Sequence, residues 1–310
     1  MTATDGSAAP LGPGAVHVRV PATSANLGSG FDTFGLALDL YDDLVVQAGD
    51  PAHGDAVEVT IEGEGEATVA TDASNLVVRA VHRALDELGA PRPPLLLRCT
   101  NRIPHGRGLG SSAAAVVAGL VAGRALVDQG ERLDDTALLG LATEMEGHPD
   151  NAAACLLGGF TVAWTDPAGA HAASMATRDD LVLTVAVPPQ PLATETARGL
   201  LPPTVPHADA AHAAARSALL VLALQTAGPR PDVLLLAATE DRLHQAYRAP
   251  AMPATLDLVS RLRADGRAAV VSGAGPSVLV LDLAPTPVSA PAGWRVLQLA
   301  VAGGVTLRQL

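Results

Sequence analysis

Alternating apolar and polar residues predict β-strands in the first half of the chain. Val16, Val18 and Val20 are separated by polar side chains, which is the period of a half-buried strand. Further apolar runs predict strands at residues 34–40, 44–48, 57–61, 95–99 and 160–164. We expect a turn at Asp42 and Asp43 to join the first two of these runs.

Apolar residues at intervals of three and four predict helices between these strands. One helix follows Asn75, whose side chain can cap its first turn, and ends before Gly89. A second helix, at residues 113–127, consists of Ala, Val, Leu and Gly apart from one arginine, so we expect it to be buried on most sides. Asp134 is expected to cap a third helix, which leads to Glu146.

The second half of the chain predicts strands and helices without the regular alternation of a doubly wound sheet. Strands are expected at residues 181–187, 268–272, 278–283 and 294–301, and helices at 194–201, 208–226, 233–242 and 254–263. The polar stretch 165–180 is the best candidate for a domain boundary. The predicted class is therefore α+β, with a flexible tail at 1–14, a first domain at 15–165 and a second domain at 166–310.

Composition narrows the class of protein. Apolar residues make up 48% of the 310 residues and aromatic residues only 2%, so the core must be aliphatic. The formal charge of −12 argues against nucleic acid as a partner, because nucleic-acid binding needs a basic surface. Since no apolar run is long enough to span a membrane, we expect a soluble, cytoplasmic protein. Cys99 and Cys155 lie in apolar contexts that indicate buried free thiols.

A glycine-rich loop between the strand at 95–99 and the helix at 113–127 is the strongest chemical signal. It reads PHGRGLGSSAA from Pro104 to Ala114. Glycines let backbone N–H groups turn toward an anion, and a helix start adds further N–H groups and a positive dipole end. The chain contains no lysine, so this is not a Walker P-loop, and its glycine spacing departs from the dinucleotide-binding pattern. An ordinary turn before a core helix is the alternative.

Three further segments carry groups suited to binding or catalysis. Residues 25–32 form a glycine loop with an amide, Asn26, and a carboxylate, Asp32, which could pair with an ammonium group. Glu146, at the start of the segment 146–151, is a carboxylate at a helix end that could hold Mg²⁺. Residues 272–277 form a glycine-rich turn between two strands. Considered alone, each of these could be an ordinary turn, helix end or cap.

Together these motifs resemble those of the GHMP kinases. The pattern PxGxGLGSSAA is similar to the phosphate loop of that family, and the motifs occur in the family's order between residues 21 and 277. Within the family, the homoserine kinases are similar to this chain in the sequence motifs PATSANLGxGFD, EGHPDN and SGxGPS. They also resemble this chain at TETAR, residues 194–198, and at DRLHQAYR, residues 241–248. The sequence is therefore identified as a member of the GHMP kinases.

The resemblance implies a role for each candidate residue. It implies that ATP binds Asn75 and the phosphate loop, namely Pro104, His105, Gly106, Arg107, Gly108, Leu109, Gly110, Ser111, Ser112, Ala113 and Ala114. It assigns Mg²⁺ to Ser112 and Glu146, which form the expected catalytic set with Asn151. It implies that the substrate is bound by Asn26, Asp32, His148, Thr194, Arg198 and Arg248. Of these, Asp32 would bind an ammonium group, and the two arginines a carboxylate.

The same resemblance implies an activity and an architecture. A first domain like domain 2 of ribosomal protein S5 and a ferredoxin-like second domain would enclose the site. The implied reaction is phosphoryl transfer from ATP to the side-chain hydroxyl of L-homoserine, a step of threonine biosynthesis, by a homodimer. Glu144 is an alternative to Glu146 for the metal. Asp150 could act as a general base, although a loose transition state needs none. A kinase for mevalonate or a sugar, and a nucleotide sensor without catalysis, are the alternative functions.

Overall fold

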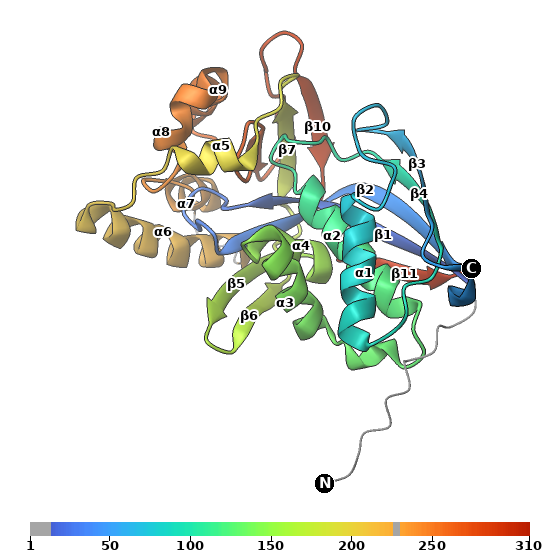
Figure 1. Ribbon diagram of the computed structural model, residues 1–310. Helices are drawn as coiled ribbons and strands as arrows, with labels where there is room; N and C mark the ends of the chain where they lie inside the picture. The colour runs from blue at the N-terminus through green and yellow to red at the C-terminus, as the bar shows by residue number, and fades with distance from the viewer. Residues whose placement is uncertain (1–13, 226–229) are drawn as a thin grey trace.

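The structure, a computed structural model, describes residues 14–225 and 230–310 and contains two β-sheets with helices packed against both (Figure 1). Residues 1–13 of the predicted tail and the predicted last residue of the helix at 208–226 lie outside the described residues. The mixed arrangement confirms the α+β class. None of the described helices combines the length and the apolar character required to cross a membrane.

In the described part of the chain, the first sheet has seven strands. These are β1 (Ala15–Ala25), β2 (Phe34–Ala48), β3 (Val57–Gly63), β4 (Leu95–Asn101), β5 (Phe160–Asp166), β6 (Gly169–Met175) and β11 (Thr306–Gln309). The order is β11-β1-β2-β4-β3, and all pairs are antiparallel except β3 and β4. One end of β2 pairs with β4 and the other with β5, so β2 carries the sheet from the phosphate loop to the hairpin of β5 and β6.

The predicted turn at Asp42 and Asp43 is wrong, because β2 continues through both residues. Their carboxylates find partners inside the sheet. Asp42 accepts hydrogen bonds from the backbone N–H groups of Arg102 and Ile103, at 2.5 and 2.9 Å. Asp43 pairs with His17 and Arg102. The polar pair therefore fastens β2 to the segment after β4 instead of reversing the chain.

Nine helices are found among the described residues. They are α1 (Leu76–Leu88), α2 (Ser111–Ala125), α3 (Asp135–Glu146), α4 (Asp150–Leu157), α5 (Thr194–Gly199), α6 (His207–Gln225), α7 (Pro231–Ala238), α8 (Gln245–Arg248) and α9 (Pro253–Ala264). The predicted caps Asn75 and Asp134 are confirmed, since both side chains accept backbone N–H groups at the starts of α1 and α3. The helix predicted at 233–242 ends earlier, because Asp241 caps the next turn by accepting the N–H groups of residues 243–245.

The helix α2 follows the phosphate loop and is buried along most of its length, as its composition predicts. Gly119 and Gly123 bring it against α1, since a Cβ at either position would lie 2.5 Å or 2.7 Å from a carbonyl oxygen of α1. Interior packing at this closeness fixes the axis of α2. The packing of α2 on α1 and on β1 therefore holds the phosphate loop in place.

In the described residues, the second sheet has four strands in the order β10-β7-β9-β8, all antiparallel. Their bounds are β7 (Val182–Val187), β8 (Ala268–Val271), β9 (Val278–Asp282) and β10 (Arg295–Leu299). The sheet is covered on both faces. Leu279 and Leu281 of β9 belong to the main core with α6 and α7, whereas Val278 and Val280 join a smaller core with α9.

The sheets do not divide the chain at residue 165. The strands β6 and β11 both lie in the stretch 166–310, yet β6 pairs with β5, and β11 pairs with β1. The sequence analysis predicts neither strand. β6 consists of Ala, Gly, His, Ser and Met, and every residue of β11 is exposed, so neither has the run of large apolar residues that indicates a strand.

Candidate active site

The phosphate loop turns sharply between β4 and α2. Gly106, Gly108 and Gly110 have φ angles of 64°, 70° and 70°, a conformation that favours glycine. A Cβ at Gly108 would lie 2.2 Å from the carbonyl oxygen of Ser272, so the loop also needs glycine for space. The glycines therefore allow the loop to pass directly against the turn at 272–277.

The carbonyl groups of this loop and its N–H groups differ in their hydrogen bonding. Three carbonyls accept hydrogen bonds, from Leu192 N to Gly106 O, from Ser272 Oγ to Gly108 O and from Thr23 N to Leu109 O. Within the described ranges, none of the N–H groups of residues 106–112 donates a hydrogen bond. Free N–H groups beside a helix N-terminus form an anion site.

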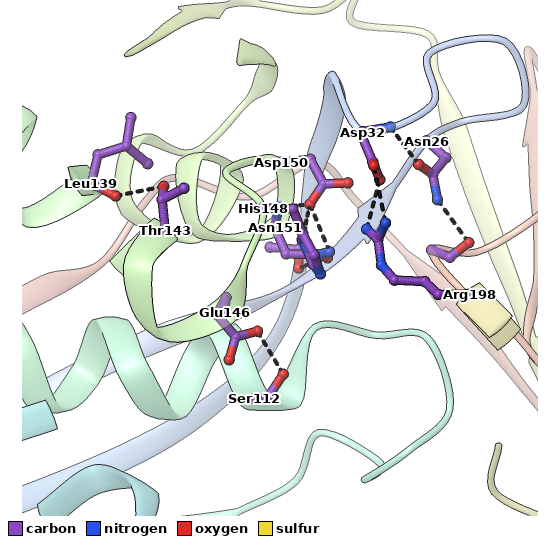
Figure 2. A network of polar contacts seen from close by, with 12 residues as sticks. Asn26, Asp32, Ser112, Leu139, Thr143, Glu146, His148, Asp150, Asn151 and Arg198 are labelled. Atoms are coloured by element: carbon purple, nitrogen blue, oxygen red, sulfur yellow. Dashed lines mark hydrogen bonds and ion pairs between the residues drawn. The ribbon is translucent and has the colours of Figure 1, made fainter. Parts of the chain in front are cut away.

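A pair of oxygen ligands lies next to this loop. The hydroxyl of Ser112 donates a 2.7 Å hydrogen bond to Oε2 of Glu146, the last residue of α3 (Figure 2). Burial raises the pKa of Glu146, and the hydrogen bond from Ser112 opposes this. Glu144, the alternative, is exposed and pairs with Arg83. Of the two carboxylates, Glu146 is therefore the one that contacts the loop.

A cavity of about 300 Å³ joins the phosphate loop to the remaining predicted residues. Its predicted members are Asn26, Gly106, Gly108, Gly110, Ser111, Ser112, Glu146, His148, Asn151, Thr194, Arg198 and Arg248. They come from both sequence halves, and the turn at 273–274 completes the wall. The fold thus brings together, in one cavity, an open set of backbone N–H groups and a set of charged side chains.

Asp32 does not line this cavity itself, but it forms a two-point ion pair with Arg198, which does. The two guanidinium nitrogens Nη1 and Nη2 donate to the carboxylate at 3.0 and 2.7 Å (Figure 2). Asp32 has a φ of 54° and is held by Asn26, whose Oδ1 accepts its N–H at 2.9 Å. Asn26 also donates from Nδ2 to Gly273 O at 2.8 Å. Asn26 therefore braces the loop, and its polar atoms are already engaged.

Arg248 lies deeper than Arg198 and is only 1% exposed. Burial, together with the charge of Arg198, lowers its pKa to about 10. The neighbouring guanidinium groups of Arg198 and Arg248 repel each other, and an anionic ligand between them would relieve that repulsion. The ring of Phe31 lies 5.6 Å from the guanidinium carbon of Arg248 and 5.8 Å from that of Arg198. Phe31 is a contact that the sequence analysis misses.

His148, Asp150 and Asn151 form one network at the start of α4 (Figure 2). Oδ1 of Asp150 lies 2.8 Å from Nδ1 of His148 and accepts the N–H and the Nδ2–H of Asn151 at 2.7 and 3.2 Å. This contact raises the pKa of His148. Oδ1 of Asn151 accepts the hydroxyl of Thr23 at 2.8 Å, so Thr23 is a further supporting residue.

A second cavity, of about 260 Å³, opens on the other side of the loop and shares Ser111 and Ser112 with the first. Its walls are mainly apolar, and its predicted members are Asn75, His105 and Ala114. Asn75 uses its side chain internally, on Val77 N and Ala70 O. The sequence analysis misses the apolar lining, such as Leu44, Ile61, Val69 and Ala118, because it is indistinguishable in sequence from core.

Four predicted ATP-binding residues line neither of these two cavities. Pro104, Leu109 and Ala113 are buried in the packing around the loop. Arg107 turns its guanidinium to the carbonyl oxygens of Pro188 and Pro189, at 3.1 and 2.6 Å. Its side chain therefore ties the loop to the end of β7. Any contact from these four residues to ATP would have to come from backbone groups.

Comparison with known proteins agrees with these motifs. Residues 75–159 match the family model described as GHMP kinases N terminal domain. A homoserine kinase of Streptomyces coelicolor is 59% identical, over 88% of this chain and 86% of the relative. Another, of Clavibacter michiganensis, is 55% identical, over 87% and 83% of the two chains. The crystal structure of a homoserine kinase from Cytophaga hutchinsonii is 26% identical and superimposes with a TM-score of 0.80, covering 96% and 98% of the chains. The chain therefore belongs to the homoserine kinase family of the GHMP kinases.

Proposed function

We propose that this chain transfers the γ-phosphoryl group of ATP to the side-chain hydroxyl of L-homoserine, giving O-phospho-L-homoserine for threonine biosynthesis. Membership of the homoserine kinase family supports an ATP-dependent kinase that acts on a hydroxyl group. The observation that carries the proposal is one cavity whose walls include the loop with open N–H groups, Arg198 and Arg248, with Asp32 paired to Arg198 beside it. An anion site and a site for a zwitterionic amino acid therefore meet.

Two cavities that share Ser111 and Ser112 support a site for the nucleotide. The apolar cavity suits a purine base, and the open N–H groups of residues 106–112 suit its phosphates. The polyphosphate would then extend into the polar cavity of about 300 Å³, which Arg198 also lines. This arrangement supports ATP as the phosphoryl donor.

Magnesium fits the oxygen pair of Ser112 and Glu146. Mg²⁺ prefers hard oxygen ligands and usually takes one or two carboxylates together with phosphate oxygens and water. No cluster of three His, Cys, Asp or Glu side chains that could hold a metal is found among the described residues, in keeping with a metal that relies on the nucleotide. When bound, Mg²⁺ would neutralise charge on the outer phosphates. Ser112 and Glu146 would hold it beside the phosphate loop.

The acceptor is a zwitterion, and the site carries both complementary charges. Asp32 would accept its ammonium group, while Arg198 and Arg248 would share its carboxylate, with Thr194 at the rim of the cavity. In the absence of an acceptor, Asp32 and Arg198 satisfy each other. Entry of L-homoserine would therefore replace part of one ion pair with two new ones. Asn26 would fix Asp32, and His148 and Asn151 would position the rest of the acceptor.

We propose that Asp150, which lines the polar cavity, supports its neighbours and does not act as a general base. Its Oδ1 already faces three nitrogen atoms of His148 and Asn151, and the residue is 1% exposed. A loose transition state demands little removal of the hydroxyl proton before the phosphorus–oxygen bond forms. We propose that Asp150 orders His148 and Asn151, and that positioning and charge neutralisation supply the catalysis.

ADP formation with Mg-ATP and a panel of acceptors tests the proposed function. The panel is L-homoserine, D-homoserine, L-serine, mevalonate and galactose. Selective turnover of L-homoserine, with one phosphoryl group added to its side-chain oxygen, is expected. Turnover of mevalonate or galactose would retain the nucleotide site and contradict the acceptor site. ATP binding without any turnover would indicate a nucleotide sensor.

Two broader features are also proposals. We propose a homodimer that works in the cytoplasm, and both rest on the resemblance to the family. Sedimentation of the purified chain tests the first, and fractionation of cells tests the second.

A further inference from the structure

A fully buried histidine, His244, contacts the buried guanidinium group of Arg248. His244 is 0% exposed and directly precedes α8, which ends at Arg248. Its Nε2 lies 2.8 Å from the carbonyl oxygen of Gly28, and its Nδ1 lies 3.1 Å from Nη1 of Arg248. The imidazole therefore bridges the loop at 25–32 and the guanidinium group.

These two contacts define one tautomer. A carbonyl oxygen only accepts hydrogen bonds, so Nε2 must carry the proton that reaches Gly28. A guanidinium group only donates, so Nδ1 must offer a lone pair to Arg248. Both contacts are satisfied only by the neutral imidazole with its proton on Nε2. Burial and the charge of Arg248 lower the pKa of His244, which keeps it neutral, while Asp241, 3.5 Å from Nε2, favours the proton there.

The same contacts determine how Arg248 faces the cavity. Its Nε donates to Ala197 O at 3.3 Å, and Nη1 donates to Gly273 O at 3.2 Å as well as to His244. Among the residues that the structure describes, Nη2 has no hydrogen-bond partner, although Arg248 lines the cavity. Nη2 is therefore the nitrogen left for a ligand. The ring of Phe31 stacks on His244, with centroids 5.3 Å apart, and limits rotation of the imidazole.

We propose that His244 is a positioning residue, whose neutral Nε2–H form links the loop at Gly28 to Arg248 and aims Nη2 at the acceptor's carboxylate. The inference rests on the proposed function for the identity of that carboxylate. It adds a residue that touches neither ATP nor L-homoserine. Losing the hydrogen-bond acceptor at Nδ1 leaves the guanidinium group held only by Gly273 O and Ala197 O, so Nη2 is aimed less firmly at the cavity. Binding of L-homoserine is then weakened, and binding of the nucleotide is unchanged.

Two amide substitutions separate the two contacts. In His244→Asn the side-chain oxygen can take the place of Nδ1 and accept from Arg248, but the contact with Gly28 is lost. In His244→Gln the amide nitrogen can take the place of Nε2 and donate to Gly28, but the hydrogen-bond acceptor for Arg248 Nη1 is lost. Both variants replace the same imidazole with an amide, so each serves as the stability control of the other, checked by thermal unfolding.

We expect His244→Gln to raise KM for L-homoserine about tenfold, the effect of losing one hydrogen bond to a charged group. KM for ATP and kcat at saturating L-homoserine should stay within about twofold, and His244→Asn should retain KM for L-homoserine within about threefold. In the native protein, ¹⁵N NMR should show the His244 ring as a neutral Nε2–H tautomer across neutral pH.

Equal KM values in the two variants, or a ring protonated on Nδ1, would overturn the inference. Failure of the proposed function is a different result, because the unaltered chain would then not phosphorylate L-homoserine. The NMR signature is independent of activity and tests the bridge in that case too. A KM effect in His244→Asn alone would assign the role to the contact with Gly28 and would equally contradict the proposal.

Discussion

The two halves of the active site are built in different ways. The proposed phosphate site, on which the nucleotide half depends, is a continuous segment, residues 104–114, that offers open backbone N–H groups. The proposed acceptor half is assembled from side chains of distant segments, such as Asp32 and Arg198, which are paired with each other. The loop N–H groups of the first half have no hydrogen-bond partner among the described residues, whereas the charged side chains Asp32 and Arg198 of the second half pair with each other.

This difference predicts how each half responds to change. A backbone site tolerates side-chain substitution but depends on loop shape, which glycine and the carbonyl anchors set. A side-chain site depends on each charge, and its affinity is the difference between ligand contacts and the internal pairs they replace. Substitutions in the acceptor half should therefore alter KM for the acceptor, whereas changes of loop shape should alter ATP binding.

The largest effect should come from Glu146, the proposed metal ligand between the two halves. We expect Glu146→Gln to lower kcat at least about 10³-fold, because the charge that develops on the phosphates loses its metal. ATP should still bind, since the N–H groups remain. The matched control is Glu144→Gln, on the same helix, whose side chain is 65% exposed. Comparable losses in both variants would show that α3, and not the oxygen pair, is responsible.

Arg198→Ala should weaken binding of L-homoserine to the acceptor half. We expect KM for L-homoserine to rise about 30- to 100-fold, because hydrogen bonds to charged groups contribute about 1.5–3 kcal/mol each. KM for ATP should change little. Steady-state kinetics with each substrate varied measures both constants. Arg216→Ala, which removes a pair with Glu240 away from the two site cavities, is the control. A rise confined to KM for ATP would contradict the assignment.

Gly108→Ala should weaken ATP binding by changing only the shape of the phosphate loop. The added Cβ meets the carbonyl oxygen of Ser272 in a residue with positive φ, so the loop must move. We expect the Kd for ATP to rise at least about tenfold, with a lower Tm. Gly140→Ala, in α3, is the control, because a Cβ there meets nothing within 4 Å. Calorimetric titration with ATP measures the effect, and unchanged binding in Gly108→Ala would show that the loop does not hold the phosphates.

The smallest effect should come from Asp150→Asn. The asparagine retains an oxygen for His148 and Asn151, so turnover should stay within about tenfold. A proton on His148 is also less favoured in this variant, because the contact that raises its pKa loses its negative charge. Single-turnover rates and a histidine NMR titration check the two effects. A loss of about 10³-fold with the fold intact would instead establish Asp150 as a general base.

The sequence predicts the nucleotide half better than the acceptor half, for a physical reason. The strand, loop and helix around residues 95–127 are consecutive, and their glycines and apolar residues have local consequences. The pairing of Asp32 with Arg198 joins residues 166 positions apart, and only the tertiary fold brings them into contact. Resemblance to a family supplied these arginines as candidates, but local pattern did not.

Other misses have equally specific causes. Phe31, Thr23 and His244 support site residues through contacts made across the fold, so nothing in their local pattern indicates them. Asp42 and Asp43 resemble a turn in sequence because the partners that hold them in β2 lie some 60 residues later, at Arg102 and Ile103. Buried free Cys99 and Cys155, by contrast, follow directly from their apolar neighbours and are confirmed.

The most direct test of the account compares L-homoserine with two truncated acceptors that keep its hydroxyl. The first, 4-hydroxybutanoate, lacks the ammonium group that Asp32 would bind, and the second, 3-aminopropan-1-ol, lacks the carboxylate for Arg198 and Arg248. The account predicts that kcat/KM falls at least about 10²-fold for each analogue, while KM for ATP is unchanged. Turnover of either analogue as efficient as that of L-homoserine would contradict an acceptor site built on those charges.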